Sequence, residues 1–333
     1  MARPPPPPRL ACVTDDLLER VRATGLLAAG APVVVLLSGG RDSVCLLDVA
    51  VRLAGPGAVS ALHVNYGLRA EASGDEALCR VLCEQRGVAL GVLTARRPED
   101  AGNFQAWARD MRLGTGARLA TARGARLATG HTASDQAETI LYRLAASPGR
   151  RALLGMAARD GLLVRPLLGV TRSQTAAHCT ARGLTWREDA SNADPAYARN
   201  RARAGLVPAL RELHPAAEAN VVRTAELLRE EAAVLDEVVE TALAGRDRIE
   251  VGHLAALPPA LARLVVRRLA EDAAGRLCAR ASARLDEIVA LGDGALDLGD
   301  GARAVVAGGV LRVEPTPPGR SSPERDGQPR SLS

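Results

Sequence analysis

The stretch VVVLLSGGRDSVCLL, residues 33–47, decides the fold, because an apolar run stops abruptly at SGG (38–40) and soon resumes. The glycines let the backbone turn sharply and bring bare N–H groups close to a ligand, which only glycine does cheaply. Asp42 and Ser43 then open a helix that we expect to continue through Val51, and its amino-terminal N–H groups and dipole favour an anion. The stretch therefore predicts a strand, a phosphate-binding turn and a helix, with pyrophosphate as the ligand.

The pattern around the turn is more specific than its glycines. A bare Gly-Gly pair is more often an ordinary strand-to-helix turn than a ligand site, whereas the complete SGGxDS pattern (38–43) directly follows an apolar strand. All 43 basic residues of the chain are arginine. P-loop NTPases need a lysine on their phosphates and PLP enzymes need one for the Schiff base, so both classes are excluded.

The composition predicts a two-domain protein with an anionic partner. A chain of 333 residues exceeds the usual size of one domain. Apolar residues make up 47% and aromatic residues 2%, so the core must be built mainly from Ala, Leu and Val. The formal charge of +5, carried by arginines that make forked contacts with phosphate, suits a polyanion. Compositional drift toward Arg and Ala is the simpler alternative.

The cysteines and the apolar runs indicate a cellular compartment. The chain has six irregularly spaced cysteines, too few for a disulfide scaffold, so we expect reduced thiols. Cys79 and Cys83 stand four apart, which fits a buried helical stripe better than a zinc or Fe–S site. The chain starts without an apolar signal-peptide core, and no run approaches the roughly 18 apolar residues that span a bilayer. We expect a cytoplasmic protein without membrane contact.

Short β-rich runs alternate with helical stretches in the first part of the chain. The expected strands lie near 33–37, 59–64, 88–94, 125–129 and 162–166. This alternation predicts an α/β fold whose doubly wound, Rossmann-like parallel sheet binds ligands at the carboxyl ends of its strands.

The pattern changes near residue 206. Apolar residues then recur at three- and four-residue spacing, as in amphipathic helices. The stretch ALDLGDGARAVVAGGVLRVEP (295–315) has Gly-rich turns between short apolar runs, as in a small β-hairpin. We therefore expect a disordered Pro-rich arm (1–10), an α/β domain (11–205), a smaller helical domain that ends in a hairpin (206–314) and a disordered tail (315–333).

Two acids stand three residues apart in TGHTASDQAET, residues 129–139. A strand that ends at Thr129 leads into a helix, which puts Asp135 and Glu138 on one helical face near the strand end. That geometry can hold an ammonium group or Mg²⁺. A solvated first turn enriched in acids is the alternative interpretation.

Five blocks of sequence carry a family resemblance. SGGRDS (38–43) resembles the signature of the PP-loop ATP pyrophosphatases, which cleave ATP between its α and β phosphates. The remaining blocks come in the order and spacing of the tRNA(Ile)-lysidine synthetases: ALHVNYGLR (61–69), ATGHTASDQAETILYRL (128–144), VRPLL (164–168) and WREDASNADPAYARNRAR (186–203). The resemblance covers roughly residues 30 to 230. The loop alone would leave the argininosuccinate, GMP and NAD synthetases and the tRNA thiolation enzymes open.

The resemblance implies roles for the turn and for the two acids. ATP would be bound by Ser38, Gly39, Gly40, Arg41, Asp42, Ser43 and His131. Asp42 would hold Mg²⁺ on the leaving pyrophosphate. Asp135 and Glu138 would hold the incoming lysine and, with Asp42 and an arginine, form the catalytic set.

The resemblance also assigns several arginines. Arg112 or Arg109 fits the family's arginine that neutralises phosphate, and we take Arg112 as the catalytic one. Arg199 with Asn200 matches the family's Arg-Asn pair, and with Arg203 they would bind substrate. The arginines of this segment alternate too closely to share one helical face, so we expect them to meet different ligands. A basic surface helix is the alternative.

The reaction implied is ligation of free L-lysine to C2 of the wobble cytidine in the CAU anticodon of a minor tRNA(Ile). ATP would be cleaved to AMP and pyrophosphate through an adenylated cytidine. The alternatives are another PP-loop tRNA modifier such as a cytidine thiolase, a small-molecule amide synthetase, and a domain that binds tRNA without chemistry. The sequence leaves the oligomeric state open, a homodimer included.

The chain departs from the family pattern at several positions. Tyr66 stands where the family usually has His, and Thr132 and Ser134 stand in place of a His and an Asp. Arg112 is followed by Leu113 rather than Tyr, which removes a stacking partner for adenine or ribose. Longer family members add another carboxyl-terminal domain, so we expect anticodon selection to rest on the residues present here.

Overall fold

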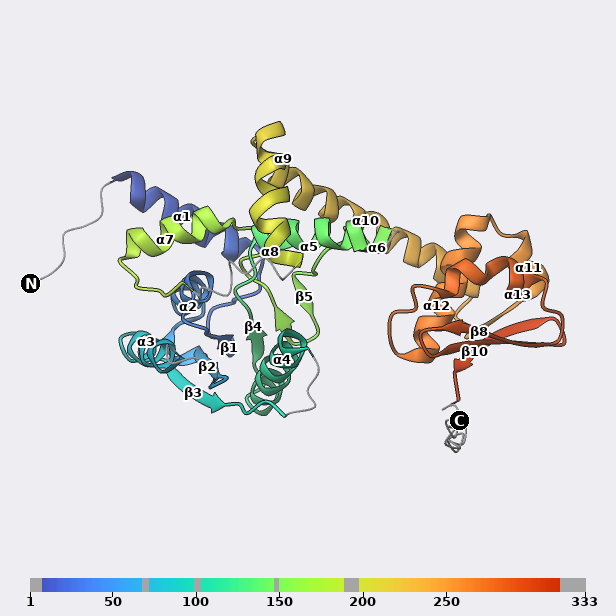
Figure 1. Ribbon diagram of the computed structural model, residues 1–333, viewed down its shortest axis with the longest axis horizontal. Helices are drawn as coiled ribbons and strands as arrows, with labels where there is room; N and C mark the ends of the chain where they lie inside the picture. Colours follow the sequence, from blue (N-terminus) through green and yellow to red (C-terminus); the bar gives the residue numbers. More distant parts are fainter. Residues whose placement is uncertain (1–7, 68–71, 99–102, 147–149, 189–197, 318–333) are drawn as a thin grey trace, which may run out of the picture. The chain divides into compact units, whose positions relative to one another are not determined.

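The computed structural model describes residues 8–67, 72–98, 103–146, 150–188 and 198–317 (Figure 1). The chain divides into two compact units, Met1–Arg229 and Glu230–Ser333. The boundary expected after residue 205 falls inside the first unit. The reason is packing that periodicity does not reveal, because Val222 packs on Ala133 and Ala137.

The first unit alternates strands and helices as expected, and all five expected strands are present as β1, β2, β3, β4 and β6. Its elements are α1 (Pro8–Ala23), β1 (Val33–Leu36), α2 (Arg41–Ala54), η1 (Pro56–Ala58), β2 (Val59–Asn65), α3 (Ala72–Glu84), β3 (Ala89–Thr94), α4 (Phe104–Ala122), β4 (Arg126–Ala128), α5 (Ala133–Ala146), α6 (Arg150–Leu153), β5 (Arg159–Asp160), β6 (Leu163–Val164), α7 (Arg172–Arg182), α8 (Ala198–Arg201), the π-helical η3 (Ala202–Leu206), α9 (Val207–Leu213) and the start of α10 (Ala217–Leu243).

The strands form one sheet in the order β3-β2-β1-β4-β6-β5 (Figure 1). β1 lies between β2 and β4 and is parallel to both, with Val33 opposite Val59 and Arg126. The edge strand β5 was not expected, and it runs antiparallel to β6. The chain runs outward from β1 to β2 and β3 and then returns to β4 on the other side of β1. The strand order therefore reverses between β1 and β4. A crevice at such a switch point, outside the carboxyl ends of the strands, is where α/β sheets bind ligands.

Helices cover both faces of the sheet, so the doubly wound α/β fold is confirmed. Val33 and Val35 of β1 join a core cluster with residues of α1, α2, α3 and α7. Val34 and Leu36 point to the opposite face, where residues of α4 pack. This alternation explains why a central parallel strand is apolar at every position. Cys79 and Cys83 are buried on α3, as expected for a helical stripe.

The second unit contains a larger sheet than the expected hairpin. Its elements are the rest of α10, β7 (Arg248–Glu250), α11 (Val251–Ala256), α12 (Pro259–Ala274), η4 (Ala281–Arg284), α13 (Leu285–Val289), β8 (Gly294–Gly299), β9 (Ala302–Ala307) and β10 (Val310–Pro315). The strands pair antiparallel in the order β7-β10-β9-β8. The Gly-rich turns expected from the sequence are present, since Asp300 and Gly301 both have positive φ, as in tight hairpin turns.

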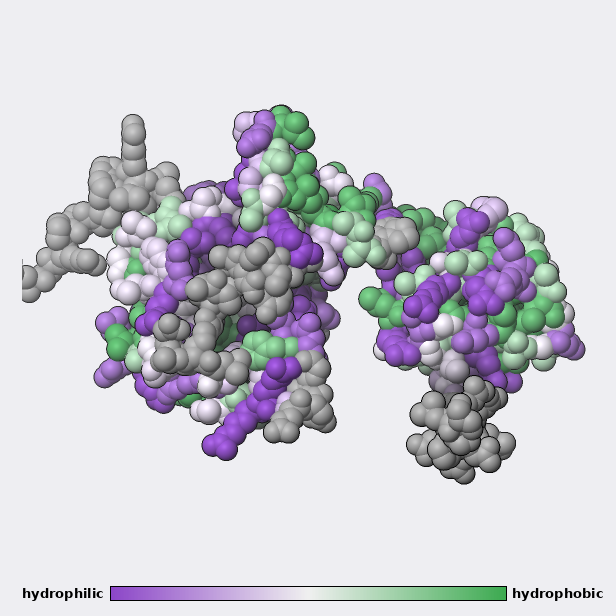
Figure 2. Space-filling model, in the orientation of Figure 1, coloured by the Kyte–Doolittle hydropathy of each residue, from purple (hydrophilic) through white to green (hydrophobic). Residues whose placement is uncertain are grey.

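Hydrophobic residues reach the surface of the first unit near α9. Figure 2 shows hydrophobic colour over α9 and the adjoining start of α10. The exposed leucines here are Leu206 at the end of η3, Leu213 of α9 and Leu227 of α10.

Within the described residues, no helix combines the length and hydrophobicity needed to cross a membrane.

A close backbone approach at Gly130 gives the first prediction. A Cβ atom at this position, just after β4, would lie 2.9 Å from the carbonyl oxygen of Asp42 at the start of α2. Gly130→Ala should therefore destabilise the first unit by about 1–3 kcal/mol, because the backbone of α2 has to shift. Both tryptophans, Trp107 and Trp186, belong to this unit, so urea unfolding followed by their fluorescence reports on it.

Gly169→Ala is the matched control for this substitution. A Cβ atom at Gly169 would meet no atom within 4 Å. The Gly169→Ala protein should unfold at the wild-type urea concentration. Equal midpoints for Gly130→Ala and the wild type would contradict the close approach of the two strand ends.

Candidate functional site

The turn that follows β1 brings two glycines and two serines to the start of α2. Gly39 has a φ of +83°, a conformation that favours glycine. Gly40 precedes α2, and no side chain caps the first N–H groups of that helix. The hydroxyl of Ser43 donates to the Gly40 carbonyl over 2.7 Å and lies 3.1 Å from the hydroxyl of Ser38. The serines brace the turn, and the free helix amino terminus favours an anion.

The two expected acids lie close together at the start of α5. Asp135 is 7% exposed and Glu138 is 1% exposed. The backbone N–H and the hydroxyl of Thr132 both donate to Oδ2 of Asp135 over 2.8 Å. Thr132, which replaces a family histidine, therefore orients Asp135. Gly130 brings this segment against the start of α2, so the acids adjoin the phosphate turn.

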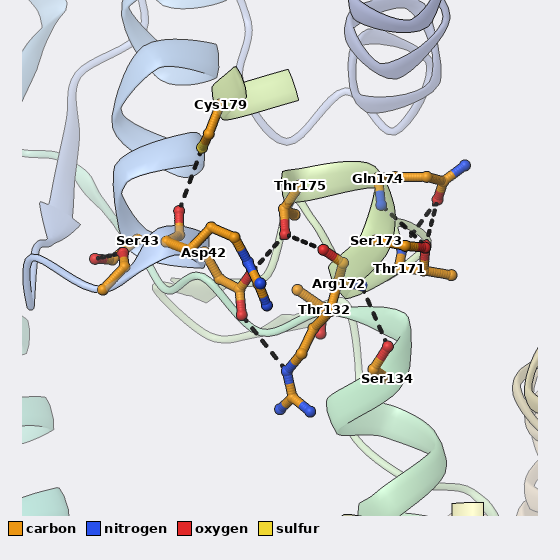
Figure 3. A network of polar contacts seen from close by, with 12 residues as sticks. Asp42, Ser43, Thr132, Ser134, Thr171, Arg172, Ser173, Gln174, Thr175 and Cys179 are labelled. Carbon is orange, nitrogen blue, oxygen red and sulfur yellow. Dashed lines mark hydrogen bonds and ion pairs between the residues drawn. The ribbon is translucent and has the colours of Figure 1, made fainter. Parts of the chain in front are cut away.

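Arg172, which sequence reasoning missed, connects the acids to the turn. Its guanidinium donates to both Asp135 and Glu138. Its Nε lies 3.7 Å from Oδ2 of Asp42, and its backbone N–H donates to the hydroxyl of Ser134 (Figure 3). Burial alone would lower the pKa of Arg172, but the surrounding carboxylates hold this pKa above its ordinary value.

A helix-start signal in the sequence could have located Arg172. Thr171 and Gln174 form a capping box at the start of α7, in which each side chain bonds the backbone of the other. The pattern Thr-x-x-Gln is readable without coordinates, and it follows the block VRPLL almost directly. It places Arg172 in the first turn of a helix beside the sheet, although it does not reveal which acids the guanidinium meets.

Asp42 is oriented by α7 and is the residue available to a metal ion. The buried hydroxyl of Thr175 donates to Oδ1 of Asp42 over 2.5 Å, and Nε of Arg41 lies 3.4 Å from the same oxygen. Among the described residues, no group of three His, Cys, Asp or Glu side chains could hold a metal ion. Mg²⁺ usually binds through one or two carboxylates together with substrate phosphates. Asp42 fits that pattern, and a protein-built metal cage does not.

One of the remaining predicted residues contacts the acid pair, and the others are placed as follows. Arg203 on η3 joins the cluster, donating to Glu138 over 2.9 and 3.3 Å. His131 lies beside the turn with Nδ1 2.8 Å from the hydroxyl of Thr129. Arg112 lies on α4, and its Nε is buried without a hydrogen-bond partner in the described structure. Asn200 lies in α8; the side chain of Arg199 is outside the described residues.

The four cysteine side chains that the structure describes in the first unit are buried, which suits them poorly to covalent chemistry. Cys45, Cys79, Cys83 and Cys179 are buried free thiols. Burial raises the pKa of Cys79 to about 12 and that of Cys83 to about 11. Since the thiolate is the reactive form of cysteine, these two thiols are inert near neutral pH.

A second ion network fixes α7 against α2. Nε2 of His178, which is fully buried, lies 3.0 Å from Oδ2 of Asp48. The guanidinium groups of Arg86 and Arg182 approach the same carboxylate to 3.6 and 3.5 Å. This network sets the spacing between the helix that follows the phosphate turn and the helix that carries Arg172.

Comparisons with known proteins agree with this geometry. Residues 17–210 match the family model described as a PP-loop domain. A tRNA(Ile)-lysidine synthase from Salinispora tropica is 40% identical, with 85% of this chain and 91% of the relative covered. The enzyme of the same name from Symbiobacterium thermophilum is 38% identical over 89% of this chain and 68% of its own. The chain spans about half the length, 48%, of the relative from Thermus thermophilus, which is 41% identical over 73% of this chain.

A solved structure shares the fold. The U34-tRNA thiolase from Methanococcus maripaludis, solved with its [4Fe-4S] cluster, matches with a TM-score of 0.56. The match covers 66% of this chain and 80% of the thiolase. Because the two sequences are 18% identical, this likeness concerns the fold alone.

The Asp48 network predicts a pH dependence of stability. Burial would raise the pKa of Asp48, but His178 and the nearby Arg182 and Arg86 hold this pKa below its ordinary value of 3.8. A lowered carboxyl pKa stabilises the fold above pH 3.8, and this stabilisation disappears as the pH falls through the folded-state pKa. Asp48→Asn should therefore cost about 3 kcal/mol near neutral pH and progressively less in acid.

Urea unfolding between neutral and acidic pH, followed by tryptophan fluorescence, measures this difference. Asp16→Asn is the control, because Asp16 makes only an exposed ion pair with Arg20. A gap between wild type and Asp48→Asn that stays constant down to strongly acidic pH would contradict the lowered pKa.

Proposed function

The chain belongs to the PP-loop family and, within it, to the tRNA(Ile)-lysidine synthases, and from this we propose its reaction. It ligates free L-lysine to C2 of the wobble cytidine in the CAU anticodon of a minor tRNA(Ile). ATP is cleaved to AMP and pyrophosphate, and the intermediate is an adenylated cytidine. The reaction takes place in the cytoplasm.

One observation carries this proposal: the glycine turn before α2 and a buried acid pair adjoin at the switch point of the sheet. We take the turn as the anion site. The anion site is the turn 38–43 with the uncapped amino terminus of α2. The acid pair is Asp135 and Glu138, and Arg172 connects it to Asp42. A reaction that expels pyrophosphate and admits an ammonium group needs these two sites within one substrate length.

The first step activates the cytosine. Its C2 is a poor electrophile, so O2 attacks the α-phosphorus of ATP. A bond from this phosphorus to oxygen forms on one side and the bond to the leaving pyrophosphate breaks on the other. The N–H groups at the turn receive the pyrophosphate, and the arginines around it offset its charge. Arg41 belongs to the turn itself, and Arg112 on α4 could contribute its Nε, which is buried without a hydrogen-bond partner among the described residues.

The second step forms the carbon–nitrogen bond. The lysine ε-amine attacks C2, and the bond from C2 to O2 breaks as AMP leaves with that oxygen. An ammonium ion cannot attack, so it must first lose a proton, and Asp135 and Glu138 are the carboxylates that hold the amine and accept it. Their burial keeps water away from the activated base.

A bound Mg²⁺ would supply further charge neutralisation on the pyrophosphate. Asp42 is the residue that would hold it, with the phosphate oxygens as its other ligands. No protein lysine can share this task, because every basic residue of the chain is arginine.

One of the two rival enzymes requires a feature that differs from this site, and the other differs in its acceptor. A cytidine thiolase needs a cysteine that is reactive or binds a cluster, whereas the thiols of Cys79 and Cys83 have pKa values of about 12 and 11. A small-molecule amide synthetase would use the same ATP chemistry with a different acceptor. The assay below separates it from a tRNA ligase.

The central prediction concerns lysine transfer. Incubating the protein with ATP, labelled lysine and tRNA(Ile) bearing the CAU anticodon should put label into RNA and release AMP and pyrophosphate. Omitting ATP should abolish the transfer, and a tRNA without a wobble cytidine should give none. Pyrophosphate release with a small carboxylic acid, and none with tRNA, would favour the amide synthetase.

The role of the acid pair gives a separate prediction. Glu138→Gln should lower kcat/KM for lysine about 10–100-fold, because a hydrogen bond to a charged group contributes about 1.5–3 kcal/mol. The KM for ATP should change little. Glu226→Gln is the control, since Glu226 makes a partly exposed ion pair with Arg223 on α10. An unchanged kcat/KM for lysine in Glu138→Gln would remove this residue from the amine site.

A further inference from the structure

The guanidinium of Arg172 occupies the carboxylates to which the proposed function assigns the substrate amine. We propose that Arg172 is a displaceable internal cation that couples binding of the amine to binding of the nucleotide. The amine displaces Arg172 from Asp135 and Glu138, and the released guanidinium turns toward Asp42 and the phosphate turn. This inference rests on the proposed function, because it takes the acid pair as the site of the amine.

Most of the acceptor sites that the two acids could offer an ammonium group are occupied in this state. One nitrogen of Arg172 bonds Oδ1 of Asp135 and another bonds Oε1 of Glu138. Oδ2 of Asp135 already accepts two hydrogen bonds from Thr132. Arg203 approaches both oxygens of Glu138, to 2.9 and 3.3 Å. An ammonium group that binds both carboxylates therefore competes with N–H donors already in place.

Arg172 is the better placed of the two arginines to move. Its Nε lies 3.7 Å from Asp42, a carboxylate that belongs to the phosphate turn rather than to the amine site. It can therefore leave the acid pair without losing every ionic partner. Within the part of the chain that the structure describes, the ion pairs of Arg203 are with Glu138 and Asp135. The side chain of Arg172 is 19% exposed, so an unpaired charge there would be costly without a new anion.

The charges of the cluster explain why the two ligands should help each other. Three carboxylates, Asp42, Asp135 and Glu138, face three guanidiniums, Arg41, Arg172 and Arg203. Among the ion pairs of the described residues these charges are equal in number, and an added ammonium group brings one further positive charge. The phosphates of the nucleotide bring negative charge to the adjoining turn, and a planar guanidinium binds phosphate through forked contacts.

The coupling is reciprocal by thermodynamic necessity. A nucleotide that draws Arg172 toward the turn exposes the acids to the amine, and the amine frees Arg172 for the nucleotide. Each ligand must then tighten the other by the same factor, typically about 5–150-fold for coupled sites. If Arg172 merely held the acids in place, its removal would weaken amine binding whether or not nucleotide is present.

The experiment measures lysine binding to the full chain by calorimetry, without tRNA. Titrations are made alone and with saturating Mg²⁺ and a non-hydrolysable ATP analogue. The wild-type Kd for lysine should fall about tenfold when the analogue is present, within the usual range of such couplings. In Arg172→Ala, lysine alone should bind at least as tightly as to the wild type, and the analogue should change its Kd less than about twofold.

Controls separate this effect from loss of structure. Arg20→Ala removes an arginine that makes an exposed ion pair with Asp16 on α1, outside both ion networks, and should keep the full tightening. Arg172→Gln tests the same point with a longer neutral side chain, and it replaces Arg172→Ala if thermal melting shows that protein to be unfolded.

Three results would overturn the inference. They are a wild-type lysine affinity that ignores the analogue, a tightening that persists in both Arg172 variants, and weaker lysine binding by those variants in the absence and presence of the analogue. A failure of the proposed function looks different, because wild-type protein would then bind the ATP analogue but not lysine under any condition.

Discussion

Two buried carboxylates on α5 cannot remain beside each other without cations, and this requirement organises the site. Asp135 and Glu138 are nearly inaccessible to solvent, so water cannot stabilise their charges. Arg172 from α7 and Arg203 from η3 supply the cations. Three separate segments of the chain, α5, α7 and η3, are thereby held at one point. The same ion pairs fix the positions of these helices relative to one another.

The sheet order brings this cluster to the phosphate turn. β1 and β4 are hydrogen-bonded neighbours, and the loops after their carboxyl ends carry the turn and the acid pair. Gly130 permits a backbone approach that a side chain at that position would prevent. The hydrogen bond from Thr175 to Asp42 then adds α7 to the same assembly. The proposed nucleotide and amine sites are adjacent because two neighbouring strands end there, so direct contacts are enough to connect them.

The sequence predicted the elements with local signals, and the contacts between distant segments were found only in the structure. A run of valines followed by Ser-Gly-Gly specifies β1 and its turn because burial on both faces and a positive φ leave few other residue choices. Arg172 pairs with Glu138, which precedes it by 34 positions, and with Asp135, which precedes it by 37 positions. No periodicity in the sequence encodes such a pairing. β7 has three residues, too few to show alternation, and only its pairing with β10 makes it a strand. The boundary expected after residue 205 lies inside the first unit for the same reason. The contacts of Val222 with Ala133 and Ala137 of α5 join distant segments and leave no pattern in the sequence.

The difference between guanidinium and ammonium gives this site its physical character. A guanidinium is a planar fork that can bond two carboxylates at once, which is how Arg172 bridges Asp135 and Glu138. An ammonium group is a compact, strongly hydrated charge with three donors, so it needs carboxylates that have already been stripped of water. By occupying the acids, Arg172 keeps them dehydrated and correctly spaced before any amine arrives. In the proposed exchange, the amine replaces the guanidinium at two carboxylates that are already close together and free of water. The free energy needed to bring these two like charges together is supplied by folding.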